Sequence, residues 1–278
     1  MNTSKHLYAM RLRSFLLALL LVVALPNLFA WGQKGHRVVA QLAYERLSSK
    51  AKRQIDATLG KGGMIYWCNW ADEIKSDTVL AYTYDWHYQD LPSGLAESSL
   101  VVLLQDYPTE GGNLFHAMAD IVAGLQQHTD SISVLAHRLS AKQGLILLIH
   151  LAADRFCPMH TGHLDDLGGN KVKMKWFAQS TNLHSVWDDK LIESRGLSYT
   201  EYALWLNNRY ATTRDSLMAM TEQDILCANY ALTRCIYRYQ NDFDGNTYHY
   251  IYRFKDDLDR QLFHAGTYLA NLLNKIYR

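Results

Sequence analysis

The sequence has little of several features that would define a class at once. Its 278 residues include only four cysteines and four prolines, and 28 basic against 27 acidic residues leave a net charge of +1. Four cysteines are too few for a fold built on disulfides, and a chain that is 49% hydrophobic is too apolar for intrinsic disorder. Near-neutrality argues against a basic nucleic-acid-binding surface, because phosphate contacts normally come from clustered Lys and Arg.

The chain also lacks an apolar run long enough to cross a membrane. Residues 15–25 are apolar, whereas a transmembrane helix needs about 20 such residues. Lys5, Arg11 and Arg13 precede this run and Ala30 follows it, which is the order of a secretory signal peptide. We predict a signal peptide over residues 1–30 and an exported, periplasmic or secreted chain over residues 31–278. It would have no membrane anchor and a net charge of −2, from 25 basic and 27 acidic residues.

Hydrophobic spacing predicts a mainly α, single compact multi-helix domain with a short β-hairpin. Helices are expected over residues 34–47, 50–59, 113–128, 131–154, 183–194, 199–210, 221–240 and 255–277. Strict polar/apolar alternation from Lys171 to Trp176 predicts a strand or hairpin arm. No internal repeat or low-complexity tract divides the sequence, and we expect a monomer.

The cysteines leave two states open. Export permits disulfides, but Cys227 and Cys235 lie eight residues apart in one predicted helix. That spacing is about 12 Å along the axis, too far for a bond. Cys68 and Cys157 could bond to each other, or both could be buried free thiols.

Two His-xxx-Asp pairs are the strongest functional signal. His150 and Asp154 lie four residues apart in an apolar stretch, and His184 and Asp188 repeat that spacing, so each pair projects from one helix face. A buried ionised aspartate is costly unless it is paired or binds a metal. One pair alone would more often be a salt-bridged core histidine. Two pairs with His160 between them favour a metal site inside a helical core.

Two further candidate ligands lie upstream, Asp72 after Trp70-Ala71 and His87 after Trp86. Aromatic neighbours would exclude water from a polar site, although tryptophans are more often simply core residues. Histidine and aspartate ligands without thiolate, in an exported protein, favour zinc in a hydrolytic role.

Taken in order, these segments resemble the zinc-dependent S1/P1 nuclease family, within the phospholipase C/P1 nuclease superfamily. The resemblance rests on Trp31 with His36, Trp-Ala-Asp at 70–72, His-Tyr-Gln-Asp at 87–90, His150 with Asp154, Pro-Met-His at 158–160, Gly-Gly-Asn-Lys at 168–171 and Asn182 to Asp188. It covers the chain from Trp31 to about Asp188. Each motif is short, but the ordered set is highly specific.

The resemblance implies three zinc ions in one cluster. The implied ligands are Asp72, His87, His150 and Asp154 for one ion; His160, His184 and Asp188 for a second; and the amino nitrogen and carbonyl oxygen of Trp31, with His36 and the bridging Asp154, for the third. It further implies that a hydroxide between the first two ions attacks phosphorus, with Asp72 as the catalytic residue that orients it. The products would be 5′-phosphorylated.

The implied substrates are single-stranded DNA or RNA and nucleotides, and 3′-nucleotidase activity is left open. Tyr88 matches the family's base-stacking position, and Asp90 with Asn170 matches the pair that hydrogen-bonds the base edge. Lys75 matches a basic position near the phosphate.

Two alternatives stay open. A zinc-dependent phospholipase C resembles this family in fold, cluster and N-terminal Trp, although a choline headgroup would not require Tyr88, Asp90 and Asn170. A non-catalytic exported helical binding protein would need all the candidate ligands to be coincidental.

Overall fold

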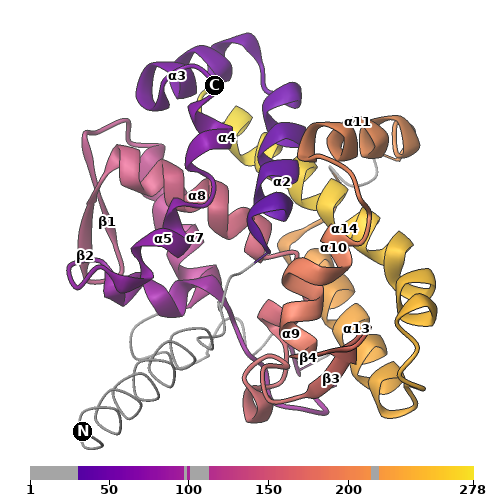
Figure 1. Cartoon of the computed structure of the whole chain (residues 1–278). Coiled ribbons are helices and arrows are strands. Elements are labelled where there is room, and N and C mark those ends of the chain that lie inside the picture. Colours follow the sequence, from indigo (N-terminus) through magenta and orange to yellow (C-terminus); the bar gives the residue numbers. More distant parts are fainter. Residues whose placement is uncertain (1–30, 97–98, 101–112, 214–218) are drawn as a thin grey trace, which may run out of the picture.

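A computed structural model describes residues 31–96, 99–100, 113–213 and 219–278, so the predicted signal peptide lies outside the described residues. The helices are α2 (Gln33–Arg46), α3 (Ser49–Leu59), α4 (Gly63–Trp67), α5 (Trp70–Glu73), α7 (Leu114–Leu125), α8 (Ala141–Asp154), α9 (Leu183–Ser185), α10 (Leu191–Glu193), α11 (Tyr199–Arg209), α13 (Glu222–Asn241) and α14 (Thr247–Ile276). The predicted mainly α fold is confirmed (Figure 1).

Helix α8 lies at the centre and is buried from Gly144 to Asp154. A helix that is apolar on all sides needs neighbours on all sides, and α2, α5, α7 and α14 all pack against it. It begins at a capping box in which Ser140 accepts from the Gln143 backbone and the Gln143 side chain accepts in return. The cap and the apolar sequence together fix the register that places His150 and Asp154 in the core.

The C-terminal helix α14 crosses the molecule beside α2 (Figure 1). Its close approach depends on Gly266, where an added Cβ would lie 2.5 Å from Leu42 Cβ and 3.3 Å from the Val39 carbonyl oxygen. A side chain at this position would push the two helices apart, because packed interiors leave no free volume. Gly266 therefore helps hold α2, which carries His36, against the core.

The predicted strand near residue 171 is present, paired in a hairpin. β3 (Lys173–Trp176) runs antiparallel to β4 (Gln179–Asn182), and along β3 the exposed lysines alternate with buried Met174 and Trp176. Asn182 then caps α9 by accepting from the Ser185 backbone. The hairpin thus leads directly into the segment that carries His184 and Asp188.

One predicted helix is wrong over its first ten residues. Residues 131–140 form a second hairpin, β1 (Ser131–Val134) with β2 (His137–Ser140), and α8 begins only at Ala141. Ile132 and Leu139 face each other across this hairpin and are buried. The period-two alternation of Ser-Ile-Ser-Val carried this information, but the apolar residues that follow also fit a helical period.

Two other helices differ from prediction. The range 183–194 is divided into α9, a π-helical turn (Val186–Lys190) and α10, and α14 begins at Thr247, eight residues before the predicted start.

Every cysteine lies within the described residues and is a free thiol, so of the two states left open for Cys68 and Cys157 the structure has the unbonded one. No helix among the described residues is long and apolar enough to cross a membrane.

Candidate metal centre

The C-terminal turn of α8 presents His150 and Asp154 on one face, as their spacing predicts. Both side chains are fully buried, and His150 Nε2 lies 3.2 Å from Asp154 Oδ2. Because every neighbouring position on α8 is also buried, this pair has no access to water along its own helix.

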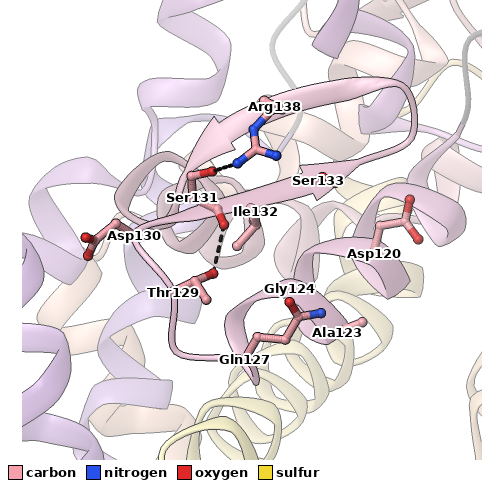
Figure 2. Close-up of a pocket in the computed structure, with 10 residues that line it drawn as sticks. All are labelled: Asp120, Ala123, Gly124, Gln127, Thr129, Asp130, Ser131, Ile132, Ser133 and Arg138. Carbon is pink, nitrogen blue, oxygen red and sulfur yellow. Dashed lines mark hydrogen bonds between the residues drawn. The ribbon is translucent and has the colours of Figure 1, made fainter.

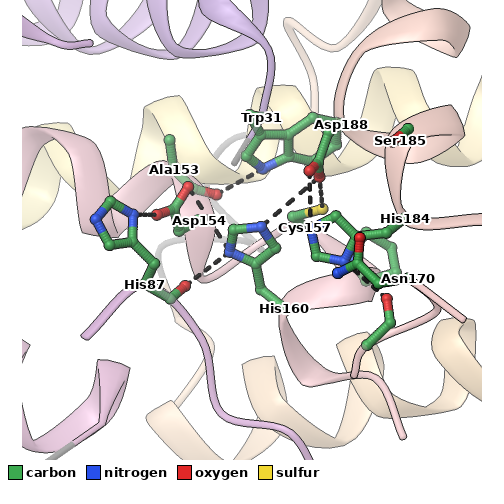
Figure 3. Close-up of polar contacts among 12 residues, drawn as sticks. Trp31, His87, Ala153, Asp154, Cys157, His160, Asn170, His184, Ser185 and Asp188 are labelled. Atoms are coloured by element: carbon green, nitrogen blue, oxygen red, sulfur yellow. Dashed lines mark hydrogen bonds and ion pairs between the residues drawn. The ribbon is translucent and has the colours of Figure 1, made fainter. Parts of the chain in front are cut away.

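Asp154 is the hub of the site. His36 Nε2 lies 3.4 Å from its Oδ1, His87 Nδ1 lies 2.9 Å from its Oδ2, and His160 Nδ1 lies 3.8 Å from its Oδ1. In Figure 3 the carboxylate stands between His87 and His160. One carboxylate therefore faces four imidazoles that come from four separate segments of the chain.

Asp72, on α5, completes the first cluster. Its Oδ1 lies 3.6 Å from His150 Nε2, 3.9 Å from His87 Nδ1 and 2.6 Å from Lys75 Nζ. Burial raises the pKa of Asp72, but His150 and Lys75 outweigh this effect, and the net pKa is lowered. Asp72 is therefore a carboxylate at neutral pH, in contact with two candidate ligands.

A second cluster surrounds Asp188, which lies on the π-helical turn. Its Oδ2 is 2.9 Å from His184 Nε2, and its Oδ1 is 3.7 Å from His160 Nε2 (Figure 3). The rings of His160 and His184 are stacked with centroids 5.3 Å apart. Single π-helical turns inside α-helical segments are frequent at functional sites, and this one places the Asp188 carboxylate beside His160 and His184.

Backbone carbonyls orient three of the histidines. His150 Nδ1 contacts the Cys68 carbonyl oxygen, His160 Nδ1 that of His87, and His184 Nδ1 that of Gly168, each at 2.7 Å. In the neutral ring, a hydrogen bond of this kind keeps the proton on Nδ1, so Nε2 is the nitrogen that can bind a metal. Nε2 of each ring faces Asp72 with Asp154, or Asp188.

Many buried polar atoms at these clusters lack hydrogen-bond partners. Within the part of the chain that the structure describes, they include both ring nitrogens of His36, Oδ2 of Asp72, Nε2 of His87 and His160, and Oδ1 of Asp154. Asp72 Oδ1 and Asp188 Oδ2 have ion-pair contacts with Lys75 and His184 instead. An unsatisfied buried polar group costs about 1–3 kcal/mol, so such a concentration calls for a partner that the protein does not supply. A set of nitrogen and carboxylate donors fits divalent zinc.

Two of the histidines are neutral at pH 7. Burial, together with the nearby His150, lowers the pKa of His36 to about 3. Burial lowers the pKa of His87 to about 4, although Asp154 opposes the effect. Both rings therefore have lone pairs ready for a metal without losing a proton.

Two other histidines are more basic than usual. Burial disfavours the charged forms of His150 and His160, but nearby carboxylates outweigh it and raise both pKa values. The pKa of His160 is raised to about 9, chiefly by Asp154 and Asp188. Burial in turn raises the pKa of Asp154, but His150 and His160 outweigh it and hold the net pKa well below its usual range.

Trp31 lies between the two clusters (Figure 3). It is fully buried, and its indole Nε1 donates to the Ala153 carbonyl at 2.7 Å, one residue before Asp154. The next backbone amide, Gly32 N–H, donates to the Asp188 carbonyl. The backbone at residue 31 is thus fixed beside both groups of candidate ligands.

Asp90, one of the residues predicted for the base pocket, lies at the edge of the centre. Gln89 N and Leu91 N donate to the carbonyls of His160 and Gly162, so residues 88–91 run beside the loop that carries the second cluster. The Gly168 turn, with φ +61°, lies against Asp90: an added Cβ there would be 2.9 Å from Asp90 Oδ1 and 2.4 Å from the Met159 carbonyl oxygen. Burial raises the pKa of Asp90 to about 7.

The other substrate-binding candidates are more exposed than the ligands. Tyr88 is half-buried, and its hydroxyl donates to Asp85 Oδ1 at 2.9 Å. Asn170 lies beside His184 (Figure 3), and its Nδ2 donates to the Leu167 carbonyl while its buried Oδ1 lacks a hydrogen-bond partner among the described residues. Tyr88, Asp90 and Asn170 therefore all lie near the centre without being part of it.

A polar pocket of about 550 Å³ opens beside Asp188, lined by the start of α2, by Ser180 to Asn182 on β4, and by residues of the π-helical turn and α10. A second pocket of about 560 Å³ lies between α7 and the β1–β2 hairpin (Figure 2). Its lining contains none of the predicted site residues and no histidine. Pocket volume alone therefore does not locate the site, whereas the convergence of ligand atoms does.

Sequence reasoning missed one member of the centre. Cys157 Sγ lies 3.2 Å from Asp188 Oδ1, within a group that also contains His160. Its position three residues after Asp154 and three before His160 was the available signal, but a lone cysteine beside a proline has no ligand spacing of its own.

Known proteins are similar to this chain over most of its length. The model of the family described as S1/P1 Nuclease matches residues 31–278. Endonuclease 3 of Arabidopsis thaliana is 28% identical over 289 aligned residues, which cover 96% of each chain. Nuclease S1 of Aspergillus oryzae is 25% identical over 201 residues, covering 68% of this chain and 67% of that protein. Nuclease P1 of Penicillium citrinum is 28% identical over 178 residues, covering 62% and 63%.

Proposed function

Because the chain belongs to the S1/P1 nuclease family, we propose that it is a zinc-dependent nuclease that hydrolyses phosphodiester bonds of single-stranded DNA or RNA. The products would carry 5′-phosphates, and nucleotides with a 3′-phosphate would be further substrates. The observation that carries this proposal is the set of buried, unpartnered nitrogen and carboxylate atoms around Asp154, Asp72 and Asp188.

The donor atoms support a cluster of three zinc ions. One set is Asp72, His87, His150 and Asp154; another is His160, His184 and Asp188; the last is His36 with Asp154 and the backbone of Trp31. Zinc would supply a nucleophile at neutral pH, because it lowers the pKa of bound water to about 7, and would neutralise charge on the phosphoryl group.

The protein's own residues would position the reaction. Asp72 is ionised and lies at the rim of its cluster, 7% exposed, where it would orient the attacking water as the catalytic residue. Lys75 contacts Asp72 at 2.6 Å and would bind a phosphate oxygen. Tyr88 would stack on the unpaired base, while Asp90 and Asn170 would hydrogen-bond its edge.

Export completes the proposal. The family match begins at Trp31, which supports a signal peptide over residues 1–30 and a catalytic domain over 31–278. The proposed enzyme is a monomer that acts in the periplasm or outside the cell. The third set of zinc ligands would then include the free amine that cleavage creates at Trp31.

The deciding experiment is an assay of the purified protein on single-stranded DNA and on phosphatidylcholine, each with and without chelator. We expect chelator-sensitive cleavage of DNA and no release of phosphocholine. Hydrolysis of the lipid without cleavage of DNA would establish the phospholipase alternative, and fewer than two zinc ions per chain with no hydrolysis would favour a non-catalytic binding protein.

Zinc uptake is expected to release protons at neutral pH. A ligand histidine must be neutral, and in the metal-free protein the pKa of His160 is raised to about 9. Its proton therefore competes with zinc below pH 9, and this competition disappears as the pH rises through that value. For this one proton, zinc affinity should rise by about ninefold from pH 7 to 8 and by about fivefold from pH 8 to 9. Calorimetric titration in two buffers of different ionisation enthalpy measures the released protons; an affinity independent of pH would contradict this expectation.

Truncation of Tyr88 to Ala is expected to raise KM for a single-stranded oligonucleotide. Stacking on an aromatic ring is worth about 1–3 kcal/mol per base, which corresponds to about 5- to 150-fold. Tyr66→Ala is a suitable control, because Tyr66 is 73% exposed and is not among the predicted site residues. Equal KM values for the two variants would remove Tyr88 from the base pocket.

A further inference from the structure

Cys157 touches the metal centre through both its backbone and its side chain. Its N–H donates to the Asp154 carbonyl at 2.9 Å, and its carbonyl accepts from the His160 N–H at 3.0 Å. The side chain is fully buried, with Sγ 3.2 Å from Asp188 Oδ1 (Figure 3). Cys157 thus joins the end of α8 to the loop of His160 and contacts the π-helical turn of Asp188.

The two oxygens of Asp188 have different surroundings. Oδ2 lies 2.9 Å from His184 Nε2, whereas Oδ1 lies 3.7 Å from His160 Nε2 and is the oxygen that Cys157 contacts. A carboxylate can rotate about its last bond and exchange its oxygens unless a donor holds one of them. The thiol is placed to hold Oδ1.

We propose that Cys157 is a positioning residue whose S–H donates to Asp188 Oδ1 and fixes the rotation of that carboxylate, so that its remaining lone pairs face His160 and His184. This role rests on the proposed function, in which Asp188 is a zinc ligand. Groups that orient metal ligands in this way typically change metal affinity by about 10- to 100-fold when removed.

The competing role for Cys157 is that of a ligand, since Sγ, His160 and Asp188 offer donor atoms within 4.8 Å of one another. Two observations favour the positioning role. The sulfur is at hydrogen-bonding distance from a carboxylate oxygen, and a thiolate there would place two negative groups in contact. His160, His184 and Asp188 already supply three ligands, and a catalytic zinc keeps its fourth position open for water or substrate.

The local backbone leaves the thiol little freedom. Cys157 precedes Pro158, which disfavours the helical region for the preceding residue, and its φ of −77° and ψ of 119° are extended. Together with the two backbone hydrogen bonds, this conformation directs the side chain to one place. A thiol at this place offers a donor to Asp188 Oδ1 without adding a strongly polar group to the core.

The test compares Cys157→Ser, which keeps a donor, with Cys157→Val, which keeps an apolar side chain of similar size without one. Zinc affinity of the full chain is measured by competition with a chelator, and melting of the metal-free proteins shows whether each variant folds. We expect Cys157→Val to lower the zinc affinity by about 10- to 100-fold. The affinity of Cys157→Ser should stay closer to that of the parent protein. Cys157→Ala, which cannot clash, gives a second donor-free variant. The control is Cys235→Ala, because the Cys235 sulfur accepts from Arg253 instead.

The reverse order, with Val close to the parent protein and Ser impaired, would show a packing role and overturn the proposal. Cobalt substitution tests the ligand role: a sulfur-to-metal charge-transfer band that is lost in Cys157→Ser would establish coordination and also overturn it. A parent protein that binds no zinc would instead contradict the proposed function itself.

Discussion

Replacing Asp154 by Asn is expected to remove most of the bound zinc and to lower nuclease activity by about a thousand-fold or more. Asp154 contacts His36, His87 and His150 at 2.9 to 3.4 Å, and it is shared between two of the proposed zinc-binding sets. An amide has one lone-pair oxygen and no charge, so it cannot bridge two cations. Metal catalysis is worth several kcal/mol, and about 4 kcal/mol corresponds to a thousand-fold in rate.

The matched control for this change is Asp259→Asn. Asp259 is equally buried, but it contacts Tyr202 and Arg195 instead of the candidate ligands. We expect this variant to lose stability and to keep its zinc content. Elemental analysis together with a single-strand cleavage assay separates the two variants, and an Asp154→Asn protein with full zinc content would rule out Asp154 as the bridge.

A protein that keeps one extra residue before Trp31 is expected to lose one zinc ion and about a hundredfold or more in activity, which corresponds to about 3 kcal/mol of lost metal contribution. Residue 31 is fixed by the indole hydrogen bond to the Ala153 carbonyl and by the adjacent Gly32 hydrogen bond to Asp188. An amine at this point has a lone pair to offer, whereas a peptide nitrogen has none.

The control for the extended protein carries the same extra residue after Arg278 instead, just beyond the C-terminal end of α14. Mass spectrometry verifies each N-terminus, and zinc content is measured beside the rate of cleavage. Undiminished activity and zinc content in the N-terminally extended protein would show that the amine of Trp31 is not a ligand.

The histidines and aspartates of the centre were accessible to sequence reasoning because their spacing is local. His150 with Asp154, and His184 with Asp188, share a helix face, and this geometry follows from four-residue spacing alone. That His150 and Asp154 meet His36 and His87 depends on how α2 and residues 81–87 pack onto α8, which no local spacing encodes. The ordered motif resemblance supplied that information, and the family match agrees with it.

Two of the errors in the fold have local causes. The β1–β2 hairpin was missed because the apolar residues from 131 onward fit both a strand period and a helix period. The start of α14 at Thr247 was missed because its cap lies in a polar turn, where Asn246 accepts from the Tyr248 and His249 backbones. Cys157 was overlooked for a different reason, because its role depends on a contact with Asp188, 31 residues away. Tertiary contacts of this kind leave no mark on nearby sequence.

The carbonyl groups that orient His150, His160 and His184 have a consequence for how such a centre changes during evolution. A main-chain carbonyl is present whatever side chain its residue carries, so the tautomer of His150 does not depend on which residue occupies position 68. The other two orienting residues, His87 and Gly168, are constrained by their own roles in the site. Position 68, for example, can accept any side chain that fits its buried site without altering the proton on His150. A substitution at such a position can therefore leave the orientation and the tautomer of the ligand histidine unchanged.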